Sequence, residues 1–395
     1  MLLAITLGFL IQKILLITVI LFGSLGVAMY ATWGERKVAG IMQDRPGPNR
    51  AGPFGLLQPI ADGVKLFMKE EIIPNRSTRF LFILGPCLAM LTATLTSAVI
   101  PWGPDIKTDD GVISLQVADI NIGMLYVFGV VSIGVYGVML GGWASNNKFS
   151  LLSAIRAASQ AISYELALGL SLIALVMMTQ SLSLREIVAQ QHGFWNDGWF
   201  TWNFFKQPLG FFIFLVCAFA ELNRAPFDLP ECESELNMGY HQEYSSMKLG
   251  FYLFAEYINL FISSAIIATL FFGGYNFPFM DAVAEAVGKD SVWMALIGVG
   301  VLLGKTIGII LLFMFVRWTV PRFRYDQLMN LGWKSMIPMA LFNMLLTGGV
   351  ILWLDSRKIH TNSEPTTTTQ QQSTPTVQAT PAGEAVPIPT LHAAH

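Results

Sequence analysis

Residues 292–316 read VWMALIGVGVLLGKTIGIILLFMFV, with Lys305 as the single charged side chain. An α-helix of about 20 apolar residues is long enough to cross a hydrocarbon core of about 30 Å. The stretch is longer than that and almost uncharged. It is therefore predicted to span a membrane as a helix.

The same pattern recurs along the chain. Hydrophobic residues make up 53% of the 395 residues and charged residues 13%, against roughly 25% charged residues in a soluble domain. We predict an all-α polytopic membrane protein with about eight transmembrane helices and a short amphipathic interfacial helix after the first. The predicted spans are 8–30, 80–101, 122–143, 160–179, 208–222, 249–273, 292–316 and 337–354.

The distribution of basic residues predicts the orientation. Loops on one side of these spans hold most of the 24 Lys and Arg residues, while Lys13 and Lys305 lie within spans. Because cytoplasmic loops carry the excess of basic residues, this side is predicted to be cytoplasmic. Both termini are then expected on the periplasmic side of an inner (cytoplasmic) membrane.

The C-terminal residues differ in composition from the rest. Residues 360–395 are rich in Thr, Gln, Pro and Ala, and such a segment cannot bury enough apolar surface to offset the entropy of ordering. We therefore divide the chain into a transmembrane helical domain, 1–359, and a disordered low-complexity tail, 360–395.

The Cys and His residues that could ligate a redox cofactor form no recognisable binding pattern. Cys87, Cys217 and Cys232 are far apart, and no histidine falls inside a predicted span, where a transmembrane haem needs axial ligands. The sequence also lacks a P-loop and a nucleotide-binding glycine fingerprint. The chain is predicted to carry no redox centre of its own.

A segment rich in Gly and Pro follows the first span. Residues 34–59 read GERKVAGIMQDRPGPNRAGPFGLLQP and predict an irregular cytoplasmic loop whose backbone comes close to another group. A plain surface loop that obeys the positive-inside rule is the alternative. Residues 54–68 place apolar side chains at helical spacing among polar ones, which predicts the interfacial helix. A simple membrane anchor would have the same pattern.

An acidic segment follows the fifth span. A solvated charged face is the usual explanation for such a run, but this one starts at a membrane helix end and alternates with apolar residues. Its carboxylates are Glu221, Asp228, Glu231, Glu233, Glu235 and Glu243.

Three more ionisable residues fall inside predicted spans, namely Glu165, Glu256 and Lys305. Charges in hydrocarbon are costly and usually mark an ion or proton path. A buried Glu–Lys pair is the structural alternative. Glutamates that follow one another into the membrane predict a proton relay, a feature that a proton-coupled transporter would share.

These segments resemble the H-subunit family (mitochondrial subunit 1) of respiratory complex I, the NADH:quinone oxidoreductase. The resemblance covers residues from about 20 to 355 and includes Arg156, Gln160, residues 163–165 (SYE) and residues 321–329 (PRFRYDQLM). Cys232 stands where many relatives have Gly or Ala, and Ser246 where Gly is usual.

The resemblance implies a subunit at the junction of the peripheral and membrane arms of complex I. Quinone would be its shared substrate, and it would bind no flavin, haem or iron–sulfur cluster. Its partners would be the peripheral-arm quinone-site subunits, the membrane-arm subunits and the lipid bilayer, with no nucleic acid. The implied quinone-chamber residues are Arg36, Lys37, Gln58, Asp62 and Lys65. The implied proton-path residues are Glu165, Glu221, Glu231, Glu233, Glu235, Glu243 and Glu256.

Two other functions remain open on the sequence. The homologous membrane anchor of a membrane-bound hydrogenase shares the fold but does not need quinone, although the first loop is closer to that of the quinone-using branch. A stand-alone secondary transporter would predict inverted repeats, and we see none.

Overall fold

The computed structural model describes residues 2–108, 111–193, 195–196, 199–288 and 291–362. The chain divides into two compact units, Met1–Ile351 and Leu352–His395. The last helix runs to Asn362, so nearly all of the predicted tail, 360–395, lies outside the described residues. The candidate sites discussed below belong to the first unit, and the last helix includes residues of both.

Long apolar helices dominate the described residues, and seven are long and apolar enough to cross a membrane. This confirms the all-α polytopic fold class. These elements are α1 (Leu2–Met42), α3 (Arg79–Thr96), α4 (Gly123–Ala144), α5 (Lys148–Thr179), α10 (Ser246–Phe271), α12 (Val292–Thr319) and α14 (Ile337–Asn362).

The fifth predicted span forms a shorter helix. α8 (Pro208–Glu221) has 14 residues, about 21 Å at 1.5 Å per residue, so alone it is too short to cross the full hydrocarbon core. A short helix, α7 (Asn203–Lys206), immediately precedes it. The other helical elements are η1 (Pro53–Gly55), α2 (Gln58–Met68), η2 (Ser97–Val99), α6 (Leu184–Gln190), α9 (Glu233–Leu236), η3 (Gly239–His241), α11 (Met280–Val287), α13 (Tyr325–Asn330) and η4 (Leu331–Met336).

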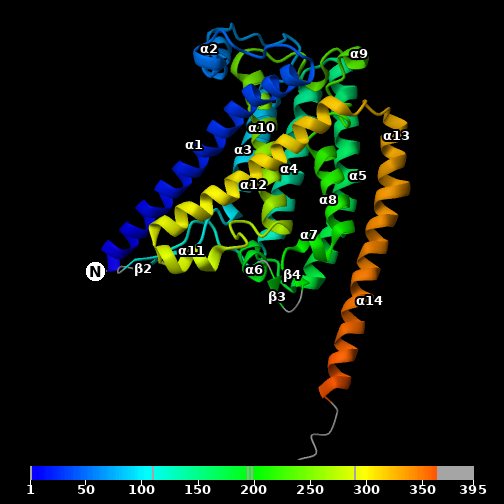
Figure 1. Ribbon diagram of the computed structural model, residues 1–395. Helices are drawn as coiled ribbons and strands as arrows, with labels where there is room; N and C mark the ends of the chain where they lie inside the picture. The colour runs from blue at the N-terminus through cyan, green and yellow to red at the C-terminus, as the bar shows by residue number, and fades with distance from the viewer. Residues whose placement is uncertain (1, 109–110, 194, 197–198, 289–290, 363–395) are drawn as a thin grey trace, which may run out of the picture. The chain divides into compact units, whose positions relative to one another are not determined.

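Two small antiparallel hairpins are the strands of the described chain. β1 (Ile106–Thr108) pairs with β2 (Gly111–Ile113), and β3 (Trp195–Asn196) pairs with β4 (Trp199–Phe200). In Figure 1, β3, β4, α6 and α7 lie at one end of the long helices, and α2 and α9 lie at the other. The residues predicted as functional belong largely to the end with α2 and α9.

α10 is the most buried of the long helices and packs against α1, α3 and α12. Glycines let α3, α4 and α10 approach closely, as in other membrane helix bundles. A Cβ atom at Gly141 of α4 would lie 2.0 Å from the Tyr252 hydroxyl of α10. That hydroxyl donates a 3.1 Å hydrogen bond to the Gly137 carbonyl, so the close approach also satisfies a buried polar group.

The prediction of a loop from Gly34 onward was wrong over its first part. α1 continues as a helix to Met42, so Glu35, Arg36 and Lys37 lie on its last turns. Val38 and Ala39 are buried, with 8% and 1% of their surfaces exposed, and their packing keeps this polar segment helical. The predicted interfacial helix is present as α2, which begins at Gln58.

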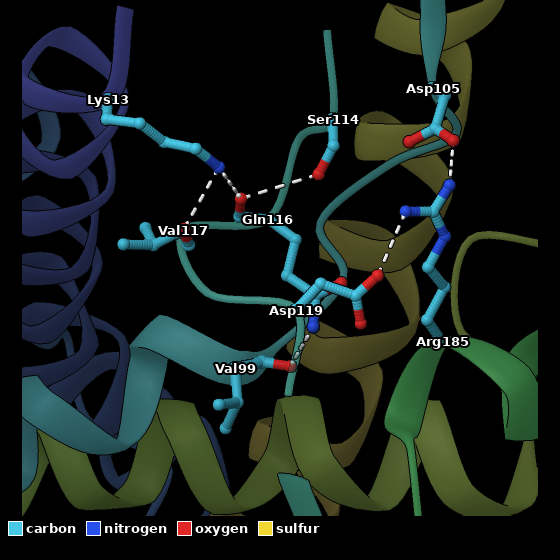
Figure 2. Close-up of polar contacts among 8 residues, drawn as sticks. All are labelled: Lys13, Val99, Asp105, Ser114, Gln116, Val117, Asp119 and Arg185. Atoms are coloured by element: carbon cyan, nitrogen blue, oxygen red, sulfur yellow. Dashed lines mark hydrogen bonds and ion pairs between the residues drawn. The ribbon is translucent and has the colours of Figure 1, made fainter. Parts of the chain in front are cut away.

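Lys13, the basic residue inside the first span, is held by carbonyl groups. Figure 2 shows its ammonium group donating to the Gln116 and Val117 carbonyl oxygens at 2.9 and 3.0 Å. The Gln116 amide in turn donates to the Val99 carbonyl at 2.8 Å. These bonds tie the segment between α3 and α4 to α1.

Arg185 of α6 ties the same segment from the opposite side. Its guanidinium pairs with Asp105 and, at 3.2 Å, with Asp119, as Figure 2 shows. An arginine that bridges two carboxylates fixes both positions along the chain. This segment is therefore anchored to both α1 and α6.

Lys305 of α12 does not form the buried Glu–Lys pair that was the structural alternative for the charges inside spans. Its ammonium group donates to the carbonyl oxygens of Phe272 and Gly274, at 2.6 and 2.8 Å, and to that of Asn276. These carbonyls follow the end of α10, where helical partners are lacking. Lys305 therefore caps α10, as basic groups near a helix C-terminus do.

Candidate functional site

The first candidate site joins the end of α1 to α2. The carboxylate of Asp62 on α2 accepts hydrogen bonds from Arg36 at 2.7 Å and from Gln58 at 3.2 Å. Lys65 lies 3.9 Å from the same carboxylate. The structure thus brings together four of the five predicted quinone-chamber residues, with three of them around Asp62.

Lys37 points away from this group. Its ammonium donates to the Asn49 side chain at 2.8 Å, which fastens the loop after α1 back onto the helix. Two glycines make this return possible. A Cβ at Gly47 would lie 2.9 Å from Lys37 Cδ, and one at Gly55, whose φ is +78°, would lie 2.1 Å from the Pro48 carbonyl oxygen. The predicted close approach of the loop backbone is therefore present, with the protein itself as the neighbour.

The helix that carries Asp62, α2, also lines an apolar groove. The groove lies between α1, α2 and α10, and its lining includes Ile60, Val64 and Phe67 of α2 together with Phe254 of α10. Phe67 and Met68 also expose most of their surfaces. α2 thus combines a polar patch around Asp62 with a large exposed apolar face, as an amphipathic helix at a lipid interface does.

The second candidate site is an internal cavity of about 140 Å³. Side chains of α3, α4, α5, α8 and α10 line it, and most of them are apolar. Three of the predicted proton-path residues, Glu221, Glu231 and Glu256, line it as well. The cavity is large enough for several water molecules, which could connect these carboxyl groups by hydrogen bonds.

A buried arginine joins this cavity to α1. Arg224 pairs with Glu35 of α1 at 2.7 Å and with Glu256 of α10 at 2.8 Å, and only 4% of its side chain is exposed. Glu35 also pairs with Arg317 of α12 and accepts a 2.8 Å hydrogen bond from the Tyr257 hydroxyl. We call Glu35, Arg224, Glu256 and Arg317 the arginine clamp. Buried charges of this kind persist only when they are paired.

A second ion pair holds the acidic segment at its middle. Arg322 donates to Asp228 at 2.6 Å and contacts the Cys232 thiol at 3.0 Å. Burial raises the pKa of Asp228, and the charge of Arg322 opposes that rise. Cys232 is buried and takes part in this contact, so it helps to hold the segment.

Glu231 and His241 meet at the cavity end of the segment. Burial and the charges of Glu256 and Asp228 raise the pKa of Glu231 well above its usual value. His241 Nδ1 lies 3.9 Å from Glu231, but burial lowers the pKa of His241 to about 4. The histidine is thus neutral near pH 7 and adds no positive charge beside Glu231.

Three other predicted proton-path residues, Glu165, Glu235 and Glu243, are not part of the cavity lining. Glu165 accepts a hydrogen bond from Ser132. Glu235 pairs with Arg156 at 2.9 Å, and Glu243 accepts from Asn147 at 2.8 Å. The side chain of Glu233 lies outside the described part of the chain.

The sequence did not predict the ion pairs of three charged residues, Glu35, Arg224 and Arg317. Glu35 seemed to belong to a surface loop, and Arg317 to a basic cytoplasmic flank. Arg224 did offer a signal, because it is the one arginine inside the acidic run. Among the described residues, no group of three or more His, Cys, Asp or Glu side chains could hold a metal ion.

Comparisons with known proteins identify the family. Residues 14–348 match the family model described as NADH dehydrogenase. The chain is 62% identical to an H subunit of NADH-quinone oxidoreductase from Cytophaga hutchinsonii, over 87% of this chain and 98% of that protein. The H subunit from Flavobacterium johnsoniae is 59% identical over 87% of this chain and 96% of its own. That from Thermomicrobium roseum is 49% identical over 83% and 93%. The chain therefore belongs to the NADH dehydrogenase family, as an H subunit of the NADH-quinone oxidoreductase complex.

Proposed function

We propose that this subunit forms the entrance and part of the wall of the quinone chamber, and that its internal cavity belongs to an acidic path that couples quinone reduction to proton transfer. The observation that carries the first half is that one helix, α2, bears both the Asp62 group and an apolar groove. A quinone has an apolar tail and a polar head group. The groove suits the tail, and Arg36, Gln58, Asp62 and Lys65 suit the passage of the head group.

The cavity supports the second half of the proposal. Glu221, Glu231 and Glu256 come from three separate segments, yet all line one cavity. Burial and nearby negative charges raise the pKa of a carboxyl group, as they do for Glu231, and such a group can exchange protons near neutral pH. Glu165, Glu233, Glu235 and Glu243 would extend the path beyond the cavity.

Electron transfer itself is assigned to partner subunits. Quinone is the shared substrate, and we propose that this chain binds no flavin, haem or iron–sulfur cluster. Its partners are the peripheral-arm quinone-site subunits and the membrane-arm subunits of the complex. We also propose that the chain lies in the inner membrane, with both termini on the periplasmic side.

The quinone site can be tested with Arg36→Met and Asp62→Asn in the intact complex. Arg36 is 54% exposed, so the ion pair contributes little to folding, roughly 0–1 kcal/mol. A several-fold loss of NADH-driven quinone reduction would then reflect the site and not misfolding. Lys69→Gln is the matched control, because Lys69 is an exposed cation directly after α2. Equal rates in all three variants and the native complex would contradict the proposal.

The acidic path is tested separately, by proton pumping in sealed vesicles. Glu221→Gln and Glu256→Gln should lower coupled turnover strongly. Glu285→Gln serves as control, because Glu285 is an exposed carboxylate on α11. Normal pumping in both cavity variants would remove them from the path.

The hydrogenase anchor remains the second candidate, because it shares the fold. The relatives named above are all subunits of NADH-quinone oxidoreductase, which favours the quinone function. The third candidate is a stand-alone secondary transporter, and transport activity of the isolated chain would favour it.

A further inference from the structure

The carboxyl groups around the cavity differ in their pairing. Arg224 lies between Glu35 and Glu256, with its Nη1 atom 2.7 Å from the first and its Nε atom 2.8 Å from the second. Arg317 supplies a second positive charge to Glu35. The arginine clamp thus holds two cations and two carboxylates, and its formal charge is balanced.

Glu221 and Glu231 have no such partner. Neither forms an ion pair with a Lys or Arg within the described part of the chain, although both line the same cavity as Glu256. Two ionisable groups lie within reach of Glu231. The Tyr240 hydroxyl hydrogen-bonds to it, and His241, at 3.9 Å, is neutral near pH 7.

The other charged groups that face Glu231 do not supply a spare positive charge. Asp228 and Tyr240 come from its own segment, Glu256 from α10, and Arg224 and Arg317 complete the set. Glu221 faces Glu165 of α5 and the Cys217 thiol of α8, and neither is a cation. Both arginines are already matched within the clamp, and Arg322 is matched by Asp228. An unmatched carboxylate in a buried site takes up a proton to avoid the cost of burying its charge.

We propose that Arg224 and Arg317 hold Glu35 and Glu256 as permanent carboxylates, and that Glu221 and Glu231 carry the exchangeable protons of the cavity. This division of roles rests on the proposed acidic path and deepens it. Arg224 acts as a positioning residue, because its charge decides which carboxyl groups in the cavity can hold a proton. Glu256 contributes a fixed negative charge next to the carriers.

Infrared spectroscopy of the intact complex in vesicles tests this division, because a protonated carboxyl group has a carbonyl band that a carboxylate lacks. Variant-minus-native spectra at neutral pH should show loss of this band in Glu221→Gln and in Glu231→Gln. The exposed Glu285→Gln variant should show no loss. If the band keeps its full strength in both cavity variants, the proposal is overturned.

Arg224→Gln provides the complementary measurement. It leaves Glu256 without a cation, so the protonated-carboxyl band should gain intensity. The gain should disappear when Glu256→Gln is added, and Arg224→Lys should show no gain, because a cation is retained. A complex with Arg224→Gln that assembles without any gain would overturn the proposal. If that variant does not assemble, the Glu221 and Glu231 spectra still decide the question.

The spectra are independent of proton pumping, so the two proposals fail in different ways. Expected bands together with normal pumping in Glu221→Gln and Glu231→Gln would keep the division of charge and remove the proton path. Impaired pumping with unchanged bands would keep the path and remove the division.

Discussion

The Arg322–Asp228 pair offers a measurable test of how the acidic segment is held. Arg322→Met leaves Asp228 buried, with its side chain 10% exposed and its Oδ1 atom without a hydrogen-bond partner among the described residues. Protonating an ordinary aspartate at pH 7 costs about 4 kcal/mol, which sets an upper limit. Because Arg322 is 40% exposed and screened by solvent, we expect a loss of about 2–3 kcal/mol.

The loss should depend on pH in a defined direction. Burial already raises the pKa of Asp228 above its unfolded value, and removing Arg322 raises it further. The folded protein then binds more protons than the unfolded chain, so its stability falls as pH rises from about 4. The deficit of Arg322→Met should therefore be smallest in acid and grow toward neutral pH.

The assay is the midpoint temperature at which the intact complex loses NADH-driven quinone reduction after a fixed time of heating. Arg322→Lys should retain part of the stability, since it keeps the charge but loses the paired contacts to Asp228 and Cys232. Adding Asp228→Asn to Arg322→Met should recover part of the loss, because the unpaired charge is gone. A midpoint equal to that of the native complex at pH 7, or no recovery in the double variant, would refute this reasoning.

Three further predictions concern single positions. Burial lowers the pKa of His241 to about 4, so the native protein should lose up to about 3 kcal/mol of stability as the pH falls from 6.5 to 4. His241→Gln should reduce this loss in the same heating assay. Lys305→Met should lower the stability by about 2–4 kcal/mol, because the carbonyl groups beyond α10 lose a charged hydrogen-bond donor. The loss is measured as a lower midpoint temperature, and an unchanged midpoint would contradict the capping role. Gly141→Ala should lower the stability by about 1–3 kcal/mol, because the added methyl group clashes with Tyr252. Gly129→Ala on the same helix, with open space around it, should be neutral or stabilising. Equal midpoints for the two variants would show that the approach of α4 to α10 is not tight.

Local sequence patterns were sufficient to predict most of the long helices. Apolar runs such as 292–316 predict a spanning helix, because burying the backbone polar groups in hydrocarbon requires a helix whatever the neighbours are. The amphipathic spacing within 54–68 likewise predicted α2. The same patterns could not predict where α1 ends, because the buried surfaces of Val38 and Ala39 depend on helices far away in the sequence.

The candidate site was predictable only in part. The sequence by itself determined that this chain is a membrane protein of the H-subunit family, with an acidic segment and carboxyl groups inside its spans. The sequence contains Glu35, Arg224 and Glu256, but it does not show that their side chains form ion pairs with one another. Arg224, in the segment after α8, reaches Glu35 of α1 across 189 positions of the chain and Glu256 of α10, so only the packing of α1 and α10 around the acidic segment decides the pairing. That pairing separates the cavity's carboxyl groups, because a buried carboxylate stays charged only where a cation lies beside it.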